Sequence, residues 1–172
     1  MTPHGKPPLS VVPPAGPDPD LAPDLHALVL TDDGTARVLL LARTAIRLLS
    51  LSGLDRFSAF AEAVITSGGT LILPEPANSW SAQTCVLSLW GVTGSDADPA
   101  VAIAEWLAAA RNVIRAHPLL AHLEDLVRRM PQDEPADSLT EAARVVSAFS
   151  RDEAALTAAK RLLSPAVQGA LQ

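Results

Sequence analysis

The sequence predicts a small α/β domain followed by a helical extension, and three observations lead to this prediction. Apolar runs at residues 38–41 and 70–73 have the length and composition of strands that are covered on both faces. Between these runs, apolar residues recur at helical spacing over residues 54–65. Beyond residue 117, long segments keep the same helical spacing.

The segment between the two apolar runs is predicted to be one amphipathic helix. Ser52 is expected to cap its start through the side-chain hydroxyl, and Gly68 with Gly69 is expected to end it at positive φ. The helix then serves as a crossover between parallel strands at residues 38–41 and 70–73. The residues expected on its buried side are Leu54, Phe57, Phe60, Ala61, Val64 and Ile65.

The order of these motifs resembles a STAS domain, the fold of bacterial anti-sigma-factor antagonists and of sulfate-transporter tails. The similar segments are Ser-Leu-Ser-Gly-Leu at residues 50–54, Gly-Gly-Thr-Leu-Ile-Leu at 68–73 and Val-Leu-Ser-Leu-Trp-Gly at 86–91. The resemblance implies a STAS-like sheet with packed helices, in which residues 86–91 form a short helix.

The same resemblance implies a non-enzymatic regulatory or accessory module that binds a protein. The residues expected to contact the partner are Ser50, Leu51, Ser52, Asp55 and Arg56. In the antagonist branch of the family, a loop serine receives phosphate, and Leu51 occupies that position here. Because leucine cannot be phosphorylated, the resemblance implies binding by shape without a phosphorylation switch.

An alternative interpretation concerns residues 36–50, which are rich in Ala, Leu and Arg and therefore in good helix formers. If this segment is a helix, the chain is an α+β domain of no named family, with a small-molecule-binding or catalytic function as the alternative to protein binding. The two interpretations are distinguishable, since the helical one places Arg43 and Arg47 on one helical face.

The chain divides into three regions. Residues 1–24 hold eight of the fifteen prolines and are expected to form an extended arm. Residues 25–116 form the expected α/β domain, which ends in a helix with Asp98 as its N-cap and Pro99 in its first turn. Residues 117–172 form the helical extension, interrupted by a proline-bounded linker at 131–135.

The helical extension contains two predicted capping boxes. Ser138 precedes Glu141 by three residues, and Ser150 precedes Glu153 in the same way. The helices they begin are short, so we expect them to pack against the domain or against a second subunit.

Composition narrows the possible partners. A net charge of −6 disfavours nucleic acid, where Lys and Arg on phosphates supply most of the affinity. The apolar runs end well short of 18 residues, so membrane insertion is not expected. The single cysteine and the lack of an apolar segment near Met1 fit a cytoplasmic protein. The expected partner is therefore another protein or a second copy of the chain.

The sequence predicts neither a catalytic nor a cofactor site, and it predicts no metal site. The four histidines lack the spacing of a metal-binding helix face. Cys85 is expected to be a small core residue. Trp80 is the tryptophan most suited to contact a partner, because it follows two polar residues.

Overall fold

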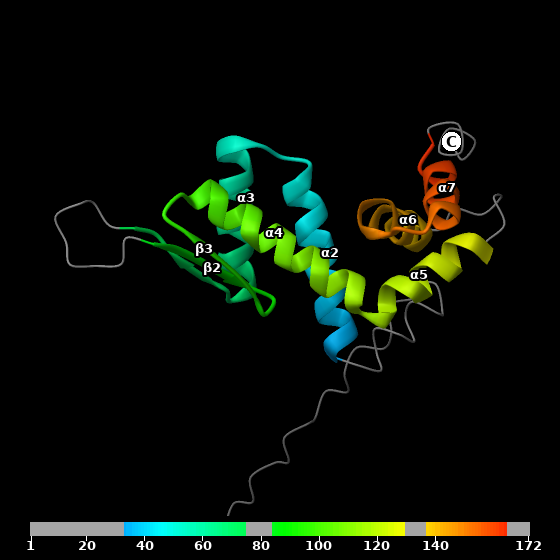
Figure 1. Cartoon of the computed structure of the whole chain (residues 1–172), viewed down its shortest axis with the longest axis horizontal. Coiled ribbons are helices and arrows are strands. Elements are labelled where there is room, and N and C mark those ends of the chain that lie inside the picture. The colour runs from blue at the N-terminus through cyan, green and yellow to red at the C-terminus, as the bar shows by residue number, and fades with distance from the viewer. Residues whose placement is uncertain (1–32, 75–83, 130–136, 165–172) are drawn as a thin grey trace, which may run out of the picture.

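The computed structural model describes residues 33–74, 84–129 and 137–164 (Figure 1). This part of the chain is mixed α/β and mostly helical, which confirms the coarse fold class. A small antiparallel sheet lies against α3 and α4, and α5, α6 and α7 lie towards the other end of α4 (Figure 1). The elements are α2 (Asp33–Leu49), α3 (Gly53–Ser67), β1 (Thr70–Ile72), β2 (Cys85–Leu89), β3 (Val92–Asp96), α4 (Pro99–Ala116), α5 (Pro118–Arg129), α6 (Asp137–Phe149) and α7 (Glu153–Leu162).

The strand predicted at residues 38–41 is wrong, because this run is part of the helix α2. A short apolar run does not by itself distinguish a buried strand from a buried helix. In α2, Val38, Leu41 and Leu48 face the core at helical spacing. Arg43 and Arg47 lie on the exposed side, as the helical alternative required.

The predicted parallel crossover from residues 38–41 to residues 70–73 is also wrong, because residues 38–41 form no strand. The strand order is β1-β2-β3, and both pairs are antiparallel, with Leu71 opposite Leu87 and Leu87 opposite Gly94. Residues 85–89 form a strand, where the STAS resemblance implied a short helix at 86–91. The chain thus lacks two of the elements that the STAS resemblance implies.

The turn between β2 and β3 is anchored to α2. Trp90 and Gly91 both have positive φ, 54° and 76°, as a two-residue hairpin turn requires. The Nε of Arg37 donates to the Trp90 carbonyl at 2.9 Å, and the indole Nε1 of Trp90 donates to the Thr44 hydroxyl at 3.3 Å. These bonds hold the hairpin against the first described helix.

Helix α4 packs directly on β3, and Gly94 permits this close approach. A Cβ at Gly94 would overlap the carbonyl oxygen of Ala102 on α4. Trp106 is fully buried beside this contact and donates from Nε1 to the Val92 carbonyl at 3.1 Å. Its ring meets Phe60 of α3 edge to face at 5.3 Å, so α3, α4 and the sheet share one core.

Two predicted helix ends are confirmed. The Asp98 carboxylate accepts from the backbone N–H of Ala100 at 2.8 Å, and Pro99 occupies the first turn of α4. At the end of α3, Gly68 adopts the left-handed conformation with φ of 72°.

The three C-terminal helices pack on one another and on the rest of the molecule. Helix α6 contacts α2 and α4, and its Val146 and Phe149 belong to the same core as Leu123 of α5. On the surface, Arg43 of α2 pairs with Glu141 of α6 through two hydrogen bonds, one of them 2.6 Å long. This pairing raises the pKa of Arg43 above its usual value.

Several predictions fall outside the described residues: the proline-rich arm at 1–24, the beginning of the α/β domain at 25–32, Trp80 and the linker at 131–135. Among the helices of the described ranges, none combines the length and the apolar character that crossing a membrane requires.

Candidate functional site

An apolar pocket lies where the N-terminal turns of α3 and α4 meet. Its volume is about 460 Å³. Leu54 and Phe57 form the α3 side, and Pro99, Ala100 and Ile103 form the α4 side. The pocket therefore lies beside the loop in which the sequence analysis placed the partner-binding residues.

Three of the five predicted contact residues are exposed in or near this loop. Ser50 follows α2 and donates its hydroxyl to the Arg47 carbonyl at 2.7 Å. Ser52 precedes α3, and Asp55 lies in the first turn of that helix. These three side chains are accessible to a partner, although none of them lines the pocket.

The other two predicted contact residues have structural contacts. Leu51 is half-buried and packs against the core. Arg56 folds back, and its Nε lies 2.9 Å from the Leu48 carbonyl and 2.8 Å from the Leu51 carbonyl. These carbonyls lie at the end of α2 and just beyond it, so Arg56 links the first turn of α3 to the end of α2, and it also lines the pocket.

The predicted side-chain cap at Ser52 is wrong. Ser52 occupies the N-cap position with an extended backbone, φ −141° and ψ 161°, but its hydroxyl makes no capping hydrogen bond. Its carbonyl still accepts the first helical bond from the N–H of Arg56 at 3.4 Å. Serine at this position is thus compatible with the helix start without stabilising it through the side chain.

The outer flank of α3 carries apolar residues that sequence reasoning assigned to the core. Leu54 is 84 % exposed and Ile65 is 81 % exposed, whereas Phe60 and Val64 supply the buried side. The prediction that Leu54 and Ile65 are buried is therefore wrong. With Ser58 and Ala61 between them, they form a stripe at spacing 4-3-4, which we call the outer stripe of α3.

The pocket beside this stripe lacks free groups for acid–base chemistry. Its two ionisable residues are Asp98, which caps α4, and Arg56, which binds two carbonyls. Cys85 lies nearby in β2 but is fully buried, and burial raises the pKa of its thiol, with a further contribution from the charge of Asp98. A buried neutral thiol is a poor nucleophile.

The residues that could bind a metal are dispersed in the described part of the chain. No group of three His, Cys, Asp or Glu side chains there is arranged around a common point. His117 accepts through Nδ1 from the N–H of Leu119 at 3.2 Å, and His122 is exposed on α5. His4 and His26 lie outside the described residues.

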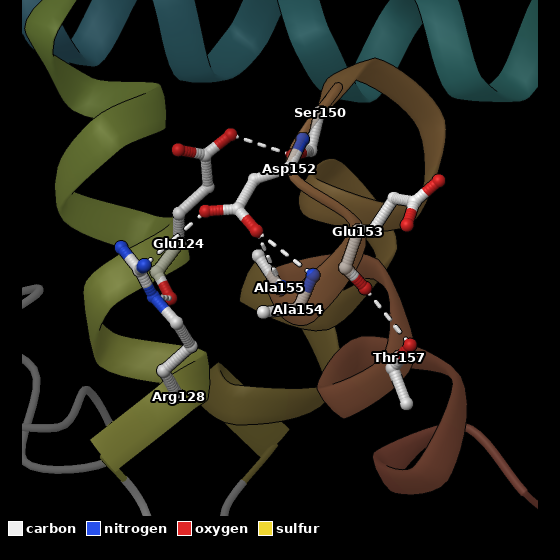
Figure 2. Close-up of polar contacts among 8 residues, drawn as sticks. All are labelled: Glu124, Arg128, Ser150, Asp152, Glu153, Ala154, Ala155 and Thr157. Atoms are coloured by element: carbon white, nitrogen blue, oxygen red, sulfur yellow. Dashed lines mark hydrogen bonds and ion pairs between the residues drawn. The ribbon is translucent and has the colours of Figure 1, made fainter.

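A second surface feature is a polar corner where the α6–α7 linker meets α5 (Figure 2). Ser150 was expected to cap α7, but Asp152 is the cap and accepts from the N–H groups of Ala154 and Ala155 at 2.8 and 3.1 Å. Ser150 instead donates its hydroxyl to Glu124 of α5 at 2.6 Å and accepts from the N–H of Asp152. Arg128 of α5 binds Asp152 at 3.2 Å.

The other capping box also differs from its prediction, because Ser138 lies inside α6 rather than before it.

A basic groove of about 480 Å³ lies between α2 and α6. Two of its arginines, Arg43 and Arg47, are paired with Glu141 and Glu62. Two of the three arginines that line the groove are therefore neutralised, one by Glu141 of the groove and one by Glu62 of α3.

The described fold and surfaces define a mostly helical α/β protein with one apolar and one polar surface site. Comparison of the chain with models of protein families, with curated protein sequences and with solved structures finds no match.

Proposed function

We propose that this protein is a non-enzymatic binding module that holds a helical segment of a partner protein along the outer stripe of α3. The observation that carries the proposal is the exposure of Leu54 and Ile65, at 84 % and 81 %, on one flank of one helix. The apolar pocket at the start of α3 extends this flank towards α4.

The exposure of two large aliphatic side chains on one flank favours a partner. Burying a leucine or isoleucine side chain contributes about 1.5 to 3 kcal/mol, and in the unbound protein this contribution is not realised at either position. Single exposed apolar residues are ordinary, but Leu54 also lines an apolar pocket, and exposed apolar side chains beside a pocket are typical of an interaction site.

The spacing of the outer stripe favours a helix as the bound element. Residues at spacing 4-3-4 form the seam along which two helices pack side by side. Leu54 and Ile65 lie about 16 Å apart along the axis, the length of three helical turns. Ser58 and Ala61 between them are small, so a partner helix can approach the middle of the seam closely while the two ends provide apolar anchors.

The rival function, a small-molecule or catalytic site in the same pocket, has weaker support. The pocket volume suits a small ligand. However, its ionisable residues are committed to the cap of α4 and to the carbonyls that follow α2. A ligand there would be held by apolar contacts, which the side chains of a docking protein also supply.

Site-specific photocrosslinking tests the proposal. A benzophenone amino acid replaces Ser58 in the full-length chain expressed in its native host, and the matched control carries it at Ser147, an exposed serine on α6. The expected result is one discrete adduct from position 58 that is absent from position 147. Its mass distinguishes another protein from a second copy of this chain.

The crosslinked protein is then purified and titrated against wild-type and Ile65→Ser protein. Loss of one buried aliphatic anchor is expected to weaken binding by roughly tenfold or more. The proposal is contradicted if positions 58 and 147 give the same adducts, or if Ile65→Ser binds the crosslinked protein as tightly as the wild type.

A further inference from the structure

A third pocket lies at the other end of α4 from the apolar pocket, between the last turns of α4 and the linker that joins α6 to α7. Its volume is about 470 Å³, and its lining is mainly polar. From α4 it receives Asn112 and Arg115, and from the linker it receives Arg151. Two carboxylates, Glu124 and Asp152, complete its polar wall.

The arginines at this pocket lack carboxylate partners in the described part of the chain. Arg115 uses its Nε to donate to the Phe149 carbonyl at 2.9 Å, which leaves its two terminal nitrogens for another acceptor. Arg151 is exposed and makes neither a hydrogen bond nor an ion pair with the described residues. One turn before Arg115, the Nε of Arg111 is buried without any hydrogen-bond acceptor.

The two carboxylates of the pocket are already engaged. Asp152 accepts from two backbone N–H groups at the start of α7 and binds Arg128, and Glu124 accepts from the Ser150 hydroxyl (Figure 2). They stabilise the corner itself. The charge of Asp152 is offset by Arg128, whereas Glu124 keeps its negative charge because its donor is a neutral hydroxyl. Arg115 and Arg151 of the lining, with Arg111 one turn before Arg115, therefore outnumber this single unpaired carboxylate.

The positive charges of Arg151 and Arg111 act on Arg115. The pKa of Arg115 lies below its usual value, first because of burial and then because of the positive charges of Arg151 and Arg111. Arg151 and Arg111 thus lie close enough to Arg115 to disfavour its charged form. An anion placed between them would reverse this effect, since opposite charge at close range favours the charged form.

We propose that this pocket binds a compact dianion, a phosphate monoester or a dicarboxylate, through the free nitrogens of Arg115, the guanidinium of Arg151 and the side chain of Asn112. Guanidinium groups bind phosphate and carboxylate oxygens in paired, charge-assisted hydrogen bonds. Because the pocket offers two positive groups, a dianion gains more from it than a monoanion does. The site therefore discriminates against monoanions such as chloride. Ligand at this site would join α4 to the α6–α7 linker.

The experiment uses the full chain, titrated by isothermal calorimetry with inorganic phosphate in one arm and with succinate in the other, at constant ionic strength set with chloride. Constant ionic strength keeps general screening the same in both arms. The test variant is Arg151→Gln, which removes an exposed side chain that makes no hydrogen bond or ion pair with the described residues. The control is Arg161→Gln, which removes an equally exposed arginine of α7 outside the pocket.

The expected result is saturable binding of at least one of the two dianions, weakened roughly tenfold by Arg151→Gln and unchanged by Arg161→Gln. Binding of phosphate alone identifies a phosphate site, and binding of succinate alone identifies a dicarboxylate site. The inference is overturned if neither dianion binds below about 10 mM, or if Arg151→Gln and Arg161→Gln lower the affinity equally, as a general charge effect would.

Discussion

The starts of α3 and α7 are both helix N-termini that follow a short linker, and they differ in whether the N-cap side chain makes a capping hydrogen bond. At α7, the N-cap Asp152 accepts from two backbone N–H groups and binds Arg128, while Ser150 is tied to Glu124 (Figure 2). At α3, the N-cap Ser52 makes no side-chain capping bond, and Leu54 two residues later is 84 % exposed.

The difference separates a corner that holds the fold together from a corner that is open to a partner. At the α7 corner, Ser150 and Asp152 are satisfied by α5 and by the start of α7, so these two residues fix the three C-terminal helices relative to one another. The α3 corner leaves apolar side chains and a pocket unfilled. Substitutions at matched positions of the two corners should therefore differ in what they change, stability in one case and binding in the other.

The largest difference is expected between two phenylalanines. Phe149, at the end of α6 beside the α7 corner, is 1 % exposed and belongs to the core, whereas Phe57 at the α3 corner is half-buried. Phe149→Ala is expected to lower the free energy of unfolding by about 3 to 5 kcal/mol, and Phe57→Ala by less than half of that. Urea denaturation of the two variants measures both, and equal losses would remove the distinction between the corners.

The next largest effect is expected at the two N-caps. Asp152→Ala removes two capping hydrogen bonds and the ion pair with Arg128, so a loss of about 1 to 2 kcal/mol in unfolding free energy is expected. Glu153→Ala, one residue further, is the control and should cost a few tenths of a kcal/mol, roughly the value of a first-turn charge. If both substitutions cost the same, the cap is not the source of the stability.

A smaller effect is expected at Ser52. The sequence alone predicts a cost of about 1 kcal/mol for Ser52→Ala, as at an ordinary N-cap serine. Because the hydroxyl makes no capping bond, the structure changes this expectation to no more than roughly 0.5 kcal/mol. Thermal unfolding of Ser52→Ala beside Asp152→Ala decides between the two values, and a loss at Ser52 equal to that at Asp152 would contradict the uncapped start of α3.

The parts of the fold that sequence predicted are those with strong local signals. Asp98 followed by Pro99 predicts the start of α4, and Gly68 predicts the end of α3, because each residue type has a conformation that the neighbouring backbone requires. The coarse α/β class and the helical spacing after Pro118 were predictable for the same reason. These signals act within one helical turn, so they do not depend on the rest of the fold.

The misassigned parts depend on contacts between distant segments. Residues 38–41 suit a strand or a buried helix equally, and only packing of α2 against α4 settles the choice. Ser150 precedes a glutamate at capping-box spacing, but Glu124 of α5 takes its hydroxyl. Neither contact leaves a trace in the local sequence.

The sequence places partner contacts at residues 50–56, and this placement stays a prediction. It assigns Leu54 and Ile65 to the core because the apolar residues of α3 cover more than one flank. Phe60 and Val64 define the buried side, and the second flank is the one at spacing 4-3-4. Separating the two flanks in the sequence was possible, since a stripe wider than a single packing face already indicates a helix with two contacts.

The most direct test of this account is the free energy of unfolding of the double variant Leu54→Ser, Ile65→Ser, measured by urea denaturation of the unbound protein. Because both side chains are more than four-fifths exposed, the value is expected to stay within about 0.5 kcal/mol of wild type. A loss of several kcal/mol, the size expected when two buried aliphatic side chains are truncated, would mean that the outer stripe of α3 is part of the core and that α3 has no open docking flank.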